Sequence, residues 1–67
     1  MNASEIVHKI RLELCWDQAE FGAYLGVTKQ SISNWEVGKR IPKMRHKRKM
    51  IELAKNNKIK IPLFGDD

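Results

Sequence analysis

The sequence predicts an all-α fold, a compact bundle of four to five short helices. Apolar residues recur every three or four positions, polar residues that favour helix N-termini precede these stretches, and glycines follow two of them. With 67 residues the chain is long enough for one domain. A domain this small buries only roughly 60% of its unfolded surface, so helix packing or a partner subunit must supply much of its stability.

The first helix is expected over residues 3–14. Asn2 stands before it as the N-cap, and Glu5 follows three residues later, where its side chain can complete a capping box. The apolar stripe of this helix repeats every four residues, with one further residue alongside: Ile6, Ile10, Leu14 and Val7.

The second and third helices are expected over residues 18–25 and 29–36. Asp17 and Glu20 repeat the capping arrangement before the second helix, and Thr28 is a suitable N-cap for the third. Each of the two helices is followed by a glycine, the residue most often found in the left-handed conformation that ends a helix: Gly26 and Gly38.

The fourth helix is expected over residues 43–56, with Pro42 at its first turn. Its apolar positions are Met44, Met50, Ile51, Leu53 and Ala54. After it, residues 58–61 alternate lysine and isoleucine, which indicates a weak strand or an extended arm. We therefore divide the chain into a folded domain over residues 1–58 and a C-terminal arm over residues 59–67.

The basic charge is concentrated in one half of the chain, which has a net charge of +5 and a pI near 9.7. Residues 1–28 carry a net charge of −2, whereas residues 29–60 carry +9. A basic face on a small domain is typical of nucleic-acid binding, although a solvated basic surface that only maintains solubility has the same composition.

Several classes of protein do not fit the sequence. One cysteine allows no disulfide within the chain, and neither a membrane-spanning apolar run nor a signal peptide is present, so we expect a cytoplasmic protein with no membrane partner. Cys15, His8 and His46 are not spaced as metal ligands, and we expect neither a metal nor a cofactor. A Cys-His catalytic pair is conceivable, but so small a chain offers no cleft to hold it, so an enzyme is not expected.

The second and third helices are separated by only three residues, which is the spacing of a helix-turn-helix motif. In such a motif Gly22 must be small because the third helix crosses nearby, and Gly26 must accept an unusual backbone angle. The apolar residues expected to face inward and hold the two helices together are Phe21, Leu25, Val27, Ile32 and Trp35.

The outward face of the third helix is polar and carries no acid. With 100° per residue, Ile32 and Trp35 define the buried direction. Four side chains project away from it: Lys29, Gln30, Ser33 and Asn34. Glutamine and asparagine can bind adenine with two hydrogen bonds, and lysine can donate to guanine. The alternative is an ordinary solvated face, although such faces usually include glutamate or aspartate.

The stretch from Gln18 to Glu36 resembles the helix-turn-helix of the Cro/repressor (XRE-like, lambda-repressor-like) family, typical of phage repressors and bacterial regulators. The resemblance covers roughly residues 10–43. It rests on Gln18, Ala19-Glu20, Gly26, Thr28 and Gln30-Ser31-Ile32, and on the run Trp35-Glu36-Val37-Gly38-Lys39 followed by Pro42. The chain departs from the family at Asp17, where many members have serine or threonine, and in an additional basic stretch after Pro42.

The resemblance implies roles for individual residues. The third helix would contact bases through Lys29, Gln30 and Asn34, with Ser33 a weaker candidate. The DNA phosphates would be contacted by Gln18, Thr28, Ser31, Lys39, Arg40 and Lys43. Arg11 and Glu36 would form a salt bridge between the first and third helices. For the basic residues from Arg45 to Lys49, phosphate contact and a solvated helix face both remain open.

Three functions are compatible with these features. The first is a small transcriptional regulator, a repressor or Cro-like protein of a phage lysogeny switch, that binds a double-stranded DNA operator as a homodimer. The second is an antirepressor-like or antitoxin-like module that binds a repressor or another protein. The third is binding to DNA without sequence preference. Contacts to a second copy or a partner would come from four apolar residues of the arm, Ile59, Ile61, Leu63 and Phe64. Alternatively, the arm could fold back over the protein's own core.

Overall fold

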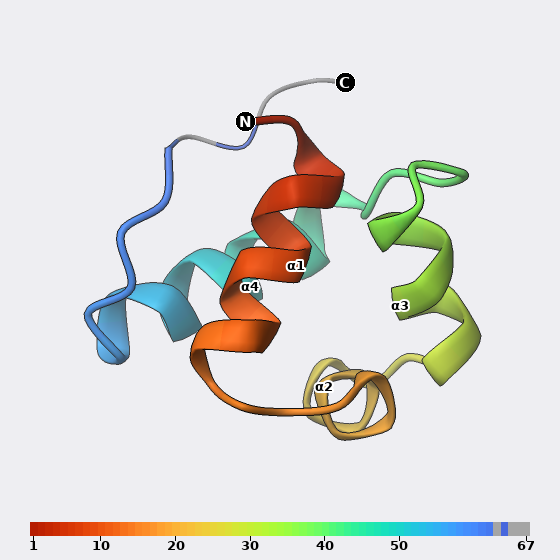
Figure 1. Cartoon of the computed structure of the whole chain (residues 1–67), viewed down its shortest axis with the longest axis horizontal. Helices are drawn as coiled ribbons and strands as arrows, with labels where there is room; N and C mark the ends of the chain where they lie inside the picture. The colour runs from red at the N-terminus through yellow and green to blue at the C-terminus, as the bar shows by residue number, and fades with distance from the viewer. Residues whose placement is uncertain (63, 65–67) are drawn as a thin grey trace.

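The computed structural model describes residues 1–62 and 64, and this part of the chain contains four helices and no strand. They are α1 (Ala3–Glu13), α2 (Gln18–Leu25), α3 (Lys29–Glu36) and α4 (Met44–Asn56). In Figure 1, α1 crosses in front of α4, and α2 and α3 lie together at one side of the molecule. The predicted all-α bundle is confirmed. No helix in the described part is long and apolar enough to span a lipid bilayer.

Side chains before α1, α2 and α3 fix where these helices begin. Asn2, Asp17 and Thr28 each accept a hydrogen bond from the backbone N–H three residues later, at 2.9, 2.8 and 3.1 Å. Helix α4 begins at Met44 instead of 43, with Lys43 as an N-cap whose side chain makes no capping bond. Three helix starts are therefore set locally, and that of α4 is not.

All four helices end in the same way, on a residue in the left-handed conformation. These residues have φ angles of 58°, 76°, 79° and 56°, and they are Cys15, Gly26, Gly38 and Lys58. In each case the N–H of the next residue donates to the carbonyl oxygen five residues earlier, at 2.8–3.2 Å, which is the Schellman motif. Only two of the four left-handed residues are glycines, so the other two ends carry backbone strain.

A single hydrophobic core joins the four helices. Its buried members are Ile6, Val7, Ile10, Phe21, Leu25, Ile32, Trp35, Met50, Leu53, Ala54 and Ile59. Val27 in the turn is partly buried against this core, so every residue predicted to face inward in the motif does so. Among the apolar positions predicted for α4, Met50, Leu53 and Ala54 are buried, Ile51 is partly buried outside this core, and Met44 has 56% of its surface exposed.

Gly22 must be small because the turn and the start of α3 lie close to it. A Cβ atom at this position would lie 2.8 Å from the carbonyl oxygen of Val27 and 3.2 Å from the carbonyl carbon of Thr28, the N-cap of α3. The backbone of the turn and of this N-cap residue therefore occupies the space that a side chain would need, which refines the predicted close approach of α3.

The segment after α4 folds back over the protein's own core. Ile59 is buried, and Ile61 and Phe64 pack against the core. In Figure 1 this segment runs along the side of the molecule away from α3. The arrangement corresponds to the fold-back alternative, whereas contact with a second copy stays a prediction, and Leu63 lies outside the described residues.

Candidate nucleic-acid interface

The carboxylate of Glu36 connects α3 to α1. The Arg11 guanidinium donates two hydrogen bonds to it, from Nε to Oε2 at 2.6 Å and from Nη2 to Oε1 at 3.0 Å. A third Arg11 hydrogen bond, from Nη1, reaches the carbonyl oxygen of Trp16 at 3.1 Å. The bidentate geometry fixes the angle between the two helices more firmly than a single contact could.

Two further side chains donate to the same carboxylate. Gln18, the first residue of α2, donates from Nε2 to Oε1 of Glu36 at 3.1 Å, and His8 Nδ1 lies 3.2 Å from that oxygen. One carboxylate on α3 thus binds side chains of both α1 and α2. The contact of His8 was not predicted, although His8 precedes Arg11 by three residues and so shares its helix face.

These contacts keep Glu36 charged but remove its charge from the protein surface. Burial alone would raise the pKa of Glu36, but hydrogen bonds from Arg11, Gln18 and His8 outweigh burial and hold the pKa below its ordinary value. Only 7% of the Glu36 side chain is exposed. Since Glu36 is the one acid in α3, the helix presents no exposed negative charge to a ligand.

The side chains predicted to contact bases lie together on the solvent face of α3. Lys29 and Gln30 are exposed, and Ser33 and Asn34 are partly exposed. Gln30 and Asn34 are joined by a hydrogen bond from Nε2 to Oδ1 at 3.0 Å. None of the four residues belongs to the hydrophobic core, so they are available to a partner.

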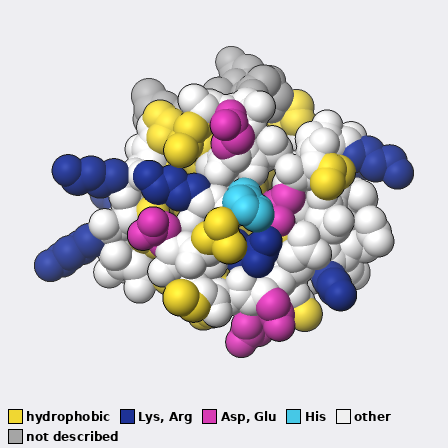
Figure 2. Space-filling view, viewed as in Figure 1, with side chains coloured by type: hydrophobic (Ala, Val, Ile, Leu, Met, Phe, Trp, Pro, Cys, Tyr) yellow, Lys and Arg dark blue, Asp and Glu magenta, His cyan; other side chains and the backbone are white. Residues whose placement is uncertain are grey.

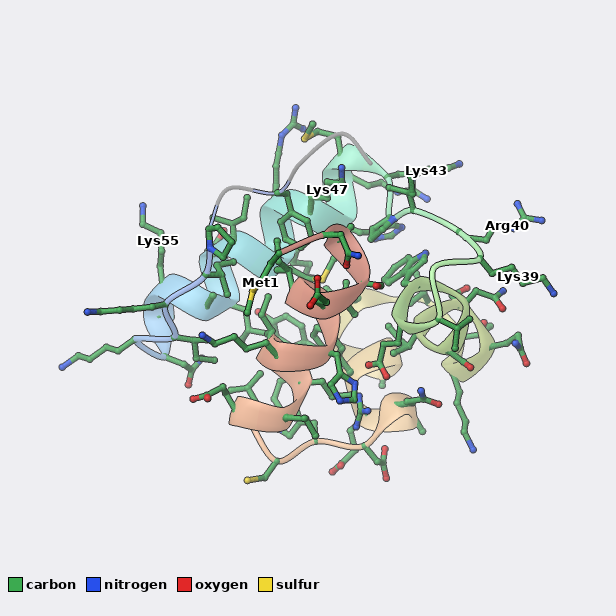
Figure 3. The ribbon with its side chains drawn as sticks, turned by 45° about the horizontal axis from the view of Figure 1, so that its top comes forward. Met1, Lys39, Arg40, Lys43, Lys47 and Lys55 are labelled. Atoms are coloured by element: carbon green, nitrogen blue, oxygen red, sulfur yellow. The ribbon has the colours of Figure 1, made fainter. Side chains whose placement is uncertain are left out.

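The loop after α3 holds basic side chains next to this face. The backbone N–H groups of Lys39 and Arg40 both donate to the carbonyl oxygen of Asn34, at 2.9 and 3.2 Å, which ties the loop to the end of α3. Figure 3 shows Lys39, Arg40 and Lys43 on the same side of the molecule and Lys55 on the opposite side. The three loop cations are all exposed.

The two hydroxyl side chains predicted to contact phosphate stand at the start of α3. Thr28 Oγ1 accepts the N–H of Ser31 at 3.1 Å, and the two hydroxyl oxygens are themselves 3.1 Å apart. A shallow hollow beside them is lined by Ser31, Asn34, Trp35 and Arg40. The hollow connects the outward face of α3 with the basic loop.

The basic residues of α4 do not form one exposed face. Lys47 is buried, with 6% of its surface exposed, and its Nζ lies 5.7 Å from the centre of the Phe64 ring. Arg45, Arg48 and Lys49 are exposed. The sequence pattern could not separate these residues, because the segment that covers Lys47 comes from much later in the chain.

His46 lies between the core and the basic loop. Its ring centre is 5.4 Å from that of Trp35. Burial lowers the pKa of His46, and the positive charges of Arg45, Lys43 and Lys49 lower it further. The imidazole therefore favours its neutral form more strongly than a free histidine does.

The face over α1 differs from the basic loop because its charges are mixed. Acidic, basic and hydrophobic side chains are interspersed there, and no charge of one sign covers the surface (Figure 2). Among residues 1–62 and 64, no three His, Cys, Asp or Glu side chains lie close enough together to hold a metal ion. The basic loop beside α3 is therefore the better surface for a polyanion.

Comparison with known proteins agrees with this geometry. A family model described as "Helix-turn-helix" matches residues 7–55, which is most of the chain. No curated protein and no solved structure matches the chain. The matched span contains all of α2, the turn and α3, together with Arg11 and the basic loop. The chain belongs to the Cro/repressor-type helix-turn-helix family of DNA-binding domains.

Proposed function

We propose that the protein is a sequence-specific transcriptional regulator, repressor-like or Cro-like, that places α3 in the major groove of an operator. The observation that carries the proposal is the outward face of α3, where amide, hydroxyl and ammonium groups are exposed and the one acid is buried. The major groove is about 12 Å wide and admits an α-helix. The base contacts would come from Lys29, Gln30, Ser33 and Asn34.

Phosphate contacts would fix the position of α3 in the groove. Lys39, Arg40 and Lys43 extend from the loop beside α3 (Figure 3) and supply positive charge without selecting a sequence. Gln18, Thr28 and Ser31 would add neutral donors at the N-termini of α2 and α3. The amide of Gln18 has two N–H groups and Glu36 takes one, so one remains for a phosphate oxygen.

The size of the molecule supports binding as a homodimer. Its principal extents are 26 × 24 × 19 Å, whereas successive major grooves on one side of DNA are about 34 Å apart. One copy therefore contacts one half-site. A shallow groove at the end of α4 would provide a surface for the second copy, and its lining includes Ile51, Ala54, Ile59, Ile61 and Pro62.

Selection from a random duplex pool tests the proposal, followed by fluorescence anisotropy titration at two salt concentrations. We expect enrichment of a palindrome with half-sites about one helical turn apart. The logarithm of affinity should fall with the logarithm of salt concentration, with a slope of about −0.9 per phosphate contact. Arg40→Gln should reduce the slope, and Lys55→Gln, on the opposite side of the molecule, is the matched control.

The alternative is a module that binds a repressor or another protein, and one observation favours it. A shallow groove along α1 includes the exposed apolar side chains of Met1 and Leu12 beside Glu5 and Glu13. If no duplex is enriched and binding at moderate salt is weak, this alternative replaces the proposal. An enriched palindrome excludes it as the main function.

A further inference from the structure

The two amide side chains on the outward face of α3 are joined to each other. Gln30 Nε2 donates to Asn34 Oδ1 at 3.0 Å. The residues are four positions apart, so both side chains lie on one face of the helix, one turn from each other. The pair is exposed to solvent and would face base edges together once α3 entered a groove.

This hydrogen bond makes the two amides different as ligands. Each amide has one carbonyl oxygen and two N–H donors. Gln30 uses one N–H in the pair and keeps its oxygen and a second N–H, which together match the N6 donor and N7 acceptor of adenine. Asn34 directs its oxygen at Gln30, which leaves one lone pair on that oxygen, and it keeps both N–H donors. With its oxygen held toward Gln30, Asn34 meets a base edge mainly through its two N–H groups.

We propose that Gln30 and Asn34 act as one recognition unit, in which Gln30 selects adenine and Asn34 selects guanine. This inference rests on the proposed function. Guanine presents two neighbouring acceptors, O6 and N7, to the two N–H groups of Asn34, whereas cytosine presents a donor and thymine one acceptor beside a methyl group. Without the hydrogen bond, Asn34 would be a second adenine ligand.

The spacing of the two residues limits where the bases lie. Four residues of helix extend about 6 Å, and base pairs along B-DNA are about 3.4 Å apart. The adenine and the guanine should therefore lie within about two base pairs of each other in each half-site. The bond also orients Gln30, so removing Asn34 should weaken the preference for adenine as well as that for guanine.

The test uses the full chain and the operator selected from the random pool. Affinity is measured by anisotropy for the operator, for each single base-pair change, and for duplexes with 7-deazaguanine or 7-deazaadenine at the two positions. For the unmodified protein, changing either base should weaken binding about tenfold or more. Asn34→Ala should lose sensitivity at the guanine and show a reduced preference at the adenine. Asn56→Ala removes an amide side chain from the exposed end of α4, outside the candidate interface, so it is the matched control and should keep both preferences.

The outcomes separate this inference from the function on which it rests. A pool with no enriched sequence overturns both. An enriched palindrome in which Asn34 selects adenine, thymine or cytosine overturns the inference alone, as does an Asn34→Ala variant with an unchanged adenine preference. Circular dichroism and thermal melting verify the fold of each variant, and the solvent exposure of the pair predicts little change.

Discussion

Replacing Arg11 with methionine should strongly destabilise the fold, because Glu36 would remain buried without its counter-ion. The carboxylate accepts hydrogen bonds at 2.6 and 3.0 Å from Arg11, at 3.1 Å from Gln18 and at 3.2 Å from His8. The substitution removes the two shortest and the only fixed positive charge. Removing one partner of a buried ion pair costs about 3–5 kcal/mol. Since Gln18 and His8 remain, we expect about 3 kcal/mol, the lower end of this range.

Urea unfolding, followed by tryptophan fluorescence, measures this loss. In a domain of this size it should lower the Tm by on the order of 10–20 °C. The double variant Arg11→Met, Glu36→Gln is the matched control, and it should recover most of the stability because a neutral amide needs no counter-ion. A loss below about 1 kcal/mol, with no recovery in the double variant, would refute the reasoning.

The pH dependence gives a second check on the same pair. In the unmodified protein the lowered pKa of Glu36 contributes stability above the ordinary glutamate pKa of about 4.3, and this contribution is lost as the pH falls. In Arg11→Met, burial acts without the guanidinium and should raise the pKa of Glu36. The carboxyl group then takes up a proton more readily. The difference in free energy of unfolding between the unmodified protein and Arg11→Met should therefore become smaller from pH 7 to pH 4. A difference that grows in acid contradicts the assigned cause.

Four further substitutions test local features. Gly22→Ala should lower the free energy of unfolding by roughly 1 kcal/mol or more, measured by urea unfolding, because the added Cβ would lie 2.8 Å from the Val27 carbonyl oxygen. An unchanged free energy would show that the backbone of the turn can move away at little cost. Cys15→Gly and Lys58→Gly should each stabilise by roughly 0.5–1 kcal/mol, since both residues are left-handed, and a lower Tm would contradict this. The pKa of His46 is lowered by burial and neighbouring cations, so the free energy of unfolding should fall as the pH drops below about 6.5. This fall between pH 7 and pH 5 should be smaller in His46→Gln. An equal fall in the variant would show that another group causes the pH dependence.

The sequence predicted best those features that neighbouring residues determine. The starts of α1, α2 and α3 were predicted from Asn2, Asp17 and Thr28, whose side chains bond to the backbone three residues away. The start of α4 was predicted one residue early, because no side chain caps that helix. The left-handed Cys15 was not foreseen, since glycine is the usual sign of that conformation.

The limits of the prediction at the candidate site follow from distance along the chain. Helical periodicity was sufficient to group Lys29, Gln30, Ser33 and Asn34, because it depends on one helix only. The role of His8 depends on a contact between residues 28 positions apart. Local patterns carry no information about such pairs.

The contacts of α3 have a consequence for how proteins of this build can diversify. The side of the helix that holds it in place uses Ile32, Trp35 and Glu36, whereas positions 29, 30, 33 and 34 contribute nothing to the core. On the proposed function, substitutions at these four positions would change which DNA is preferred while the helix keeps its orientation. The same scaffold could therefore be redirected to new operators by grafting another outward face onto α3, without redesign of the interior.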